Sequence, residues 1–185
     1  MNSFLIAPLR VLKIFGGTCV DGPGLRTSIY FAGCKHACKG CHNPESWDFN
    51  GGVSMTVGEI LKEIKYYNFN VTLSGGDPLY QDLNILAFLC KKIHDLKLNI
   101  WLYTGFTFEE LQKDKKYNKI LSVVDAIVDG PFIQKQKSTE ILFRGSKNQR
   151  IFVKKNKKWV EEYKCRFTFI LSYKEFFFLW DYFFF

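Results

Sequence analysis

Three cysteines gathered in one short segment are the residues of this chain whose type and spacing point most directly to chemistry. Cys34, Cys38 and Cys41 form the pattern CX3CX2C. Cysteine thiolates hold iron–sulfur clusters, and four of them fill the ligand positions of a cubic 4Fe–4S cluster. Because this segment supplies only three, one iron would be left without a protein ligand. An iron with an open position can bind a small molecule, so the spacing favours catalysis over plain electron storage.

The same segment is also compatible with zinc. His36 lies inside the pattern and His42 directly after it, so either ring would complete a Cys3His site in a small zinc-binding module. The spacing alone does not separate the two metals. A structural zinc site would explain neither the glycine-rich segments further along the chain nor the long scaffold around them, so the cluster is the preferred interpretation.

The elements that must position this segment alternate between strand and helix. β-branched and aromatic runs predict strands at 27–32, 70–74, 99–103 and 126–128, and apolar residues at helical spacing predict helices from 57, over 81–96 and over 107–121. Such alternation is typical of βαβ units with a parallel sheet. The units fall short of the eight that close a barrel. The predicted fold class is therefore α/β, a partial, open (βα) barrel with a mostly parallel sheet.

Each unusual segment follows one of these strands. The cysteine segment follows the first, Gly75-Gly76-Asp77-Pro78 the second, Thr104-Gly105 the third and Asp129-Gly130-Pro131 the fourth. Active sites of parallel α/β proteins gather at the carboxyl ends of the strands. We therefore expect the four segments to meet on one rim.

The segment Gly75-Gly76-Asp77 has two interpretations. Paired glycines let a backbone approach a ligand closely, and Asp77 would accept a hydrogen bond from an ammonium group. The alternative is a tight turn between strand and helix that begins at Asp77-Pro78. The segment from Asp21 to Arg26 is typical of a turn, and the polar stretch from Arg144 to Arg150 suits either a surface loop or an anionic ligand or partner chain.

Composition excludes several classes of protein. The 185 residues suffice for one domain with its own core, and Cys19, Cys90 and Cys165 are scattered, so no secreted disulfide framework is indicated. No signal peptide is evident, and we expect the cytoplasm. The net charge of +8 comes from lysine runs without interleaved aromatics, which predicts no direct binding of nucleic acid but would suit an acidic electron donor.

The block from Asp21 to Pro44 resembles radical S-adenosylmethionine (SAM) enzymes that activate glycyl-radical enzymes. It is most similar to the activators of anaerobic ribonucleoside-triphosphate reductase. Later landmarks of that group occur in the same order at 74–78, 101–105, 125–130 and 144–149. The resemblance places the open barrel in the radical SAM type. Pyruvate formate-lyase activators, which are generally longer and in some cases carry further cluster cysteines, are the alternative.

The resemblance implies a set of site residues. Cys34, Cys38 and Cys41 would ligate the 4Fe–4S cluster, whose open iron would chelate the amino and carboxylate groups of SAM. Gly40, Cys41 and His42 would line the SAM site, with the His42 ring near the adenine. Gly75, Gly76 and Asp77 would receive the methionine amino group.

The resemblance also implies a reaction and its partners. One electron from reduced flavodoxin or a similar donor would cleave SAM to methionine and a 5′-deoxyadenosyl radical. That radical would take a hydrogen from a glycine of the large subunit of the anaerobic reductase. No side chain is needed as a general acid or base, and none is predicted to be catalytic.

The last residues depart from this pattern. Members of the group usually end soon after the stretch that Arg144 begins, whereas this chain continues with a phenylalanine-rich segment to Phe185. Lys174, Glu175 and Asp181 interrupt it, so no membrane span is expected. We predict a radical SAM domain over 1–155 and an atypical tail over 156–185 that arises by read-through or frameshift in T-rich DNA. A tail that docks a partner or a membrane surface is the alternative.

Overall fold

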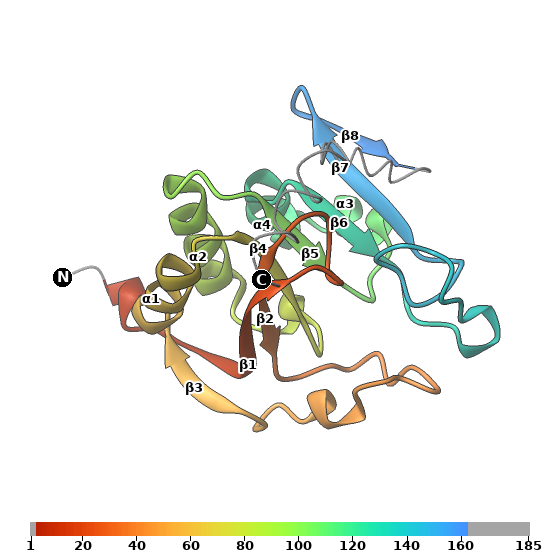
Figure 1. Cartoon of the computed structure of the whole chain (residues 1–185), viewed down its shortest axis with the longest axis horizontal. Helices are drawn as coiled ribbons and strands as arrows, with labels where there is room; N and C mark the ends of the chain where they lie inside the picture. Colours follow the sequence, from red (N-terminus) through yellow and green to blue (C-terminus); the bar gives the residue numbers. More distant parts are fainter. Residues whose placement is uncertain (1–2, 163–185) are drawn as a thin grey trace, which may run out of the picture.

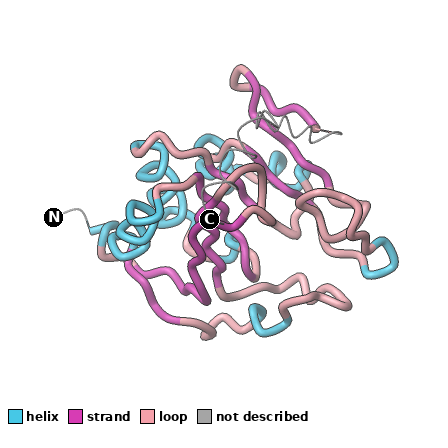
Figure 2. Tube along the Cα trace, viewed as in Figure 1, coloured by secondary structure: helices cyan, strands magenta, loops and turns pink. Residues whose placement is uncertain are grey.

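The computed structural model describes residues 3–162, which form one sheet with helices packed against it (Figure 1). The strands are β1 (Pro8–Thr18), β2 (Arg26–Phe31), β3 (Val53–Thr56), β4 (Asn70–Gly75), β5 (Ile100–Tyr103), β6 (Ala126–Asp129), β7 (Arg150–Lys155) and β8 (Lys158–Glu161). The α-helices are α1 (Val57–Tyr67), α2 (Leu83–Asp95), α3 (Phe108–Lys113) and α4 (Asn118–Val123). Figure 2 shows the long loops that join them, above all those after β2 and β6.

The sheet is parallel in its middle and antiparallel at both flanks. Its strand order is β3-β1-β2-β4-β5-β6-β7-β8. The neighbours β2, β4, β5 and β6 run parallel, whereas β1 and β3 on one side and β7 and β8 on the other pair antiparallel. The predicted open α/β sheet is confirmed, with parallel pairing confined to the four strands that carry the unusual segments.

Helices cover one face of the sheet because their apolar stripes face it. In α1 the buried positions are the predicted ones, Val57, Ile60, Leu61 and Ile64. Thr56 begins this helix with the predicted capping box, since its hydroxyl accepts from the Glu59 N–H. These side chains pack with buried residues of the parallel strands, such as Leu73, in the main core.

The predicted single helix over 107–121 is divided. The first part, α3, ends at Lys113. The next residue, Asp114, has an extended backbone with ψ at 111°, and its carboxylate accepts from the Lys116 N–H. A 3-10 turn and α4 follow. A side chain that hydrogen-bonds the following backbone competes with continuation of a helix, which explains the break.

Loops cover much of the opposite face of the sheet, which is partly polar. Trp101, Ala126, Val128 and Ile151 form an apolar cluster over β5 to β7. Beside them, Arg26 is 1% exposed and donates to Thr72 Oγ1 and the Val71 carbonyl, both at 2.6 Å. Burial lowers the pKa of Arg26 to about 10, which leaves the guanidinium charged near neutral pH.

We therefore predict that Arg26→Met destabilises the fold. The change leaves the Thr72 hydroxyl and the Val71 carbonyl without these donors inside the protein, and the free energy of unfolding should fall by about 3 kcal/mol. Urea denaturation monitored by circular dichroism measures the change. Lys62→Met on the exposed side of α1 is the control, with an expected shift within about 0.5 kcal/mol.

The sheet continues past the predicted domain boundary at residue 155. That position lies at the end of β7, and β8 pairs back onto it as a hairpin that projects from the body (Figure 1). Trp159 of the hairpin contacts the ring of Phe108 at 5.5 Å between centroids. The predictions for residues 163–185 lie outside the described residues. Within the described part, no helix is long and apolar enough to cross a membrane.

Candidate active site at the carboxyl ends of the strands

The four unusual segments meet on one rim, as expected. A cavity of about 130 Å³ is lined by residues that follow each of the parallel strands. They include the three cysteines after β2, Gly75 and Gly76 at the end of β4, Thr104 and Gly105 after β5, and Gly130 after β6. The topology therefore brings segments far apart in the sequence into one small space.

The three cysteines line this cavity from one loop that contains a tight turn. Ala37 and Gly40 have positive φ values of 47° and 77°, the left-handed conformation that a tight reversal needs. The Cys41 N–H donates to the Cys38 carbonyl at 3.0 Å, which closes the turn between these two ligand candidates. All three cysteines are free and partly exposed.

This donor set fits an iron–sulfur cluster. Burial raises the pKa of the Cys34 thiol to about 11, so a metal must displace its proton. Among residues 3–162, no three His, Cys, Asp or Glu side chains are grouped as the ligands of one metal ion. Thiolates that hold a cubic cluster each bind a different iron and need not converge on one point.

Asp77 lies behind the cavity rather than in its lining. Its carboxylate is fully buried and accepts hydrogen bonds from the protein on both oxygens. Oδ1 accepts from the Leu79 N–H at 2.9 Å, and Oδ2 accepts from the Thr104 hydroxyl at 2.8 Å and the Gly105 N–H at 3.0 Å. His36 Nε2 also lies 2.8 Å from Oδ2. The expected contact between Asp77 and an ammonium group would need one of these partners to leave.

Gly75 and Gly76 line the cavity, and their neighbours explain why they are glycines. A Cβ on Gly76 would lie 2.5 Å from the Gly33 carbonyl oxygen and 2.6 Å from that of Ser46. Gly75 has φ at 106°, and a Cβ there would collide with the backbone of Phe31. The Gly76 N–H donates to the Phe31 carbonyl at 2.8 Å. Gly75 therefore permits the close approach of β2 to β4, and Gly76 permits that of the cysteine loop to the end of β4.

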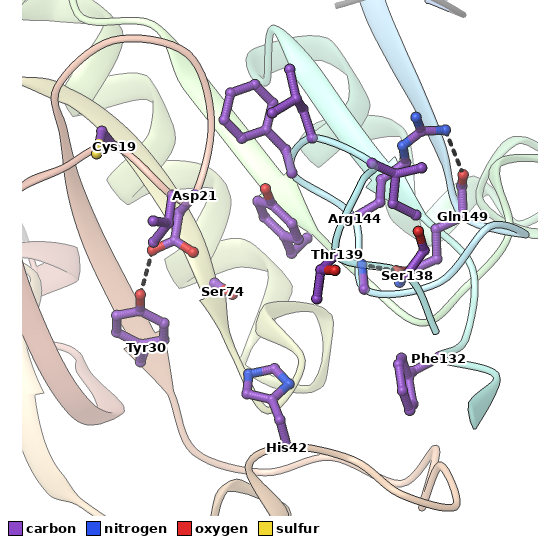
Figure 3. Close-up of a pocket in the computed structure, with 16 residues that line it drawn as sticks. Cys19, Asp21, Tyr30, His42, Ser74, Phe132, Ser138, Thr139, Arg144 and Gln149 are labelled. Atoms are coloured by element: carbon purple, nitrogen blue, oxygen red, sulfur yellow. Dashed lines mark hydrogen bonds between the residues drawn. The ribbon is translucent and has the colours of Figure 1, made fainter. Parts of the chain in front are cut away.

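A second cavity of about 680 Å³ adjoins the first (Figure 3). The two share His42, Ser74, Tyr103, Phe132 and Gln149 as lining residues. His42, predicted to lie beside the adenine of SAM, thus stands where the cavities join, whereas Gly40 lines neither of them. A cofactor bound near the cysteines has room to extend into the larger space.

Two separate parts of the chain form the walls of the larger cavity. One consists of β2 and the connection before it, and the other is the loop between β6 and β7. The Tyr30 hydroxyl donates to the Asp21 carboxylate, and burial together with this bond raises the pKa of Tyr30, so the phenol stays neutral (Figure 3). The opposite wall is the loop over 138–145. Its Arg144 donates to the Gln149 carbonyl at 3.2 Å and is the only Lys or Arg in the described lining of either cavity.

Sequence reasoning missed part of this lining. Phe132 and the residues over 138–143 stand in loops without periodicity, so no pattern assigned them to a site, whereas Arg144, Gly145 and Gln149 belong to the polar stretch for which an anionic ligand was one interpretation. Ser74 and Tyr103 end predicted strands, and that position was the signal that could have found them. Asp129 follows a strand too, but its carboxylate is buried and accepts from the Phe108 N–H and from Arg150.

Comparison with known proteins shows the family of the chain. Residues 20–152 match the model of a family described as a 4Fe–4S single cluster domain. The anaerobic ribonucleoside-triphosphate reductase-activating protein of Haemophilus influenzae is 35% identical over 153 residues, which are 77% of this chain and 97% of that protein. The protein of the same name from Enterobacteria phage T4 is 35% identical over 156 residues, or 80% and 96% of the two chains.

The corresponding Escherichia coli protein is 32% identical over 139 residues, 70% of this chain and 89% of that one. The solved structure of QueE from Escherichia coli has a TM-score of 0.45 and 17% identity over 54% of this chain and 53% of that one, a likeness too small to support an argument. The matches to the activating proteins of Haemophilus influenzae and phage T4 extend over 97% and 96% of those proteins. The chain therefore belongs to the family of anaerobic ribonucleoside-triphosphate reductase-activating proteins.

Proposed function

We propose that this protein activates an anaerobic ribonucleoside-triphosphate reductase by reductive cleavage of SAM. The observation that carries the proposal is the position of the three cysteines, which open onto a small cavity that continues into a larger one. When bound, the 4Fe–4S cluster supplies one electron at low potential and one open coordination position. The protein supplies binding, orientation and exclusion of water.

We assign a separate role in cluster and SAM binding to each group of residues on the rim. Cys34, Cys38 and Cys41 hold three irons by their thiolates. Gly40 and Cys41 shape the loop beside the SAM site, and the His42 ring packs against the adenine where the two cavities join.

In this proposal the segment Gly75-Gly76-Asp77 binds the methionyl part of SAM. Gly75 and Gly76 present backbone to its amino group, and Asp77 holds the turn behind them in place. The larger cavity, at about 680 Å³, has the volume of a typical ligand pocket and takes the rest of SAM.

Arg144 is the group in this lining best suited to an anion. Arg144 lines the larger cavity, and we propose that its guanidinium pairs with the SAM carboxylate. Arg144→Gln should raise the KM for SAM about tenfold with little change in kcat, because a charge-assisted hydrogen bond made equally in the ground and transition states is lost.

The control for this change is Lys147→Gln, an exposed residue of the same loop, which should leave the KM unchanged. The measurement is the initial rate of 5′-deoxyadenosine formation over a range of SAM concentrations. An unchanged KM combined with weaker activation of the reductase would assign Arg144 to the partner chain instead.

The target and the electron donor follow from the family and from charge. Relatives named as activating proteins of the anaerobic reductase support that reductase as the target, and we propose that a glycine of its large subunit receives the radical. Reduced flavodoxin or a similar acidic protein is the proposed donor, since a net charge of +8 favours an acidic partner. The cytoplasm is the compartment in which these partners would meet.

The test is anaerobic reconstitution followed by assay. About four iron and four sulfide per chain are expected, and SAM with dithionite should give 5′-deoxyadenosine. Addition of the anaerobic reductase should give a glycyl radical in the electron paramagnetic resonance spectrum, whereas pyruvate formate-lyase should not. One zinc per chain without 5′-deoxyadenosine would contradict the proposal, and a radical on pyruvate formate-lyase alone would reassign the target.

A further inference from the structure

His36 stands between two cluster cysteines but does not line up with them as a ligand. Its Nε2 lies 2.8 Å from Oδ2 of Asp77, and its side chain is 15% exposed against 0% for Asp77. The other partners of that carboxylate are N–H and O–H donors, and a carboxylate only accepts. The His36 Nε2–H therefore donates to Asp77.

The ring of His36 occupies a place built for it by other strand ends. Phe106 meets it edge-on at 4.7 Å between centroids and an interplanar angle of 75°, and Tyr80 lies at 5.4 Å. A Cβ on Gly105 would lie 2.5 Å from the ring, so the glycine leaves the space that the imidazole fills. Three residues from two separate turns thus enclose one side chain of the cysteine loop.

Asp77 connects three strand ends through this contact. It begins the turn after β4, it accepts from Thr104 and Gly105 after β5, and it accepts from His36 in the loop after β2. Across 34–41, His36 is the residue that the structure shows hydrogen-bonded by its side chain to another strand end. At the start of this segment one backbone bond also reaches the end of β4, from the Asp77 N–H to the Gly33 carbonyl at 3.0 Å, whereas the Cys34 N–H donates within the loop to the Trp47 carbonyl at 3.3 Å.

We propose that His36 is a positioning residue for the cluster. Its hydrogen bond to Asp77 fixes the stretch from Cys34 to Cys38 against the ends of β4 and β5, so that both thiols face the cavity before any metal arrives. The same bond sets the distance between the cluster and the SAM-binding rim, a consequence that rests on the proposed function. The imidazole binds neither iron nor SAM and acts through the loop.

Loss of the donor should weaken the site without unfolding the protein, because Asp77 keeps its bonds from Leu79, Thr104 and Gly105. His36→Leu removes the donor and keeps apolar bulk, whereas His36→Gln restores an N–H donor of similar reach. Groups that orient metal ligands typically contribute 10- to 100-fold to metal affinity. We expect H36L to lose iron to a chelator about tenfold faster than the native chain and to show an about tenfold higher KM for SAM.

The experiment compares the native full-length chain, H36L, H36Q and, as the matched control, Lys39→Ala from the exposed part of the same loop. The readouts are thermal stability of the apo-protein, iron per chain during incubation with a chelator, the electron paramagnetic resonance spectrum of the reduced cluster with and without SAM, and KM against kcat. H36Q and Lys39→Ala should resemble the native chain, and H36L should have altered g values and similar apo-protein stability.

Two results would overturn the proposal: native iron retention and KM in H36L, or equal losses in H36L and H36Q. If H36L does not fold, His36→Phe fills the space beside Phe106 and Tyr80 without a donor and takes its place. Iron retention that depends on His36 in a protein that makes no 5′-deoxyadenosine would uphold the positioning role and reject the proposed function, so the two can fail separately.

Discussion

Replacement of any one of Cys34, Cys38 and Cys41 by serine should abolish formation of 5′-deoxyadenosine and leave the fold in place. Each cysteine is partly exposed at the rim and contributes nothing to the main core. Each is proposed to hold a different iron, so the loss of one thiolate leaves two irons without protein ligands instead of one. We expect iron per chain to fall to a small fraction of the native value and the rate to fall by at least ~100-fold.

The control for these variants is Cys90→Ala. Cys90 is fully buried in the core on α2, and burial raises the pKa of its thiol to about 12, which keeps it out of metal chemistry. This change should lower thermal stability modestly and leave iron, sulfide and 5′-deoxyadenosine unchanged. Iron and sulfide assays, visible absorption and product analysis on the same preparations measure the contrast. A serine variant with native iron content would remove that cysteine from the ligand set.

The sequence predicted the part of the fold in which local pattern and tertiary role agree. Strands β2, β4, β5 and β6 are largely buried and rich in β-branched and aromatic residues, and α1 shows its buried face at helical spacing. The convergence of four segments on one rim then follows from the rule for parallel strands.

Flanking strands escaped prediction because their pattern is weak. β1 begins at a proline, contains Gly16-Gly17 and is interrupted by two shifts of register in its pairing with β2. β3 and β8 have four residues each, about half of them exposed. Antiparallel flanks such as these are defined by their neighbours more than by their own residues.

The sequence predicted the candidate cluster ligands, but it did not predict the residues that hold the cysteine loop in place. The spacing of the three cysteines predicts metal binding from a single loop, without knowledge of the rest of the fold. The role of Asp77 depends on His36, Thr104 and Gly105, which reach it only through the tertiary fold. A turn residue with a buried, saturated carboxylate and one that faces a ligand have the same local sequence, and only long-range contacts distinguish them.

Substitution of Gly76 distinguishes a glycine that is required for packing from one that is required for ligand binding. A methyl group on Gly76 would press on the carbonyls of Gly33 and Ser46, which are backbone on both sides and cannot rotate away. We predict that Gly76→Ala lowers the free energy of unfolding by about 3 kcal/mol and that the variant retains about a tenth of the native iron, because the cysteine loop is pushed from the end of β4.

Gly24→Ala is a control for a glycine replacement that introduces conformational strain without a steric collision. Gly24 has φ at 72°, but a Cβ there meets nothing within 4 Å, so only conformational strain of about 1–2 kcal/mol is expected, with native iron content. Urea denaturation of the apo-proteins and iron analysis after reconstitution measure both effects. If Gly76→Ala kept native stability and iron but raised the KM for SAM, the glycine would serve the approach of a ligand. Loss of stability and iron together would mean that Gly76 is needed for the cysteine loop to lie against the end of β4, and that the cluster depends on this contact.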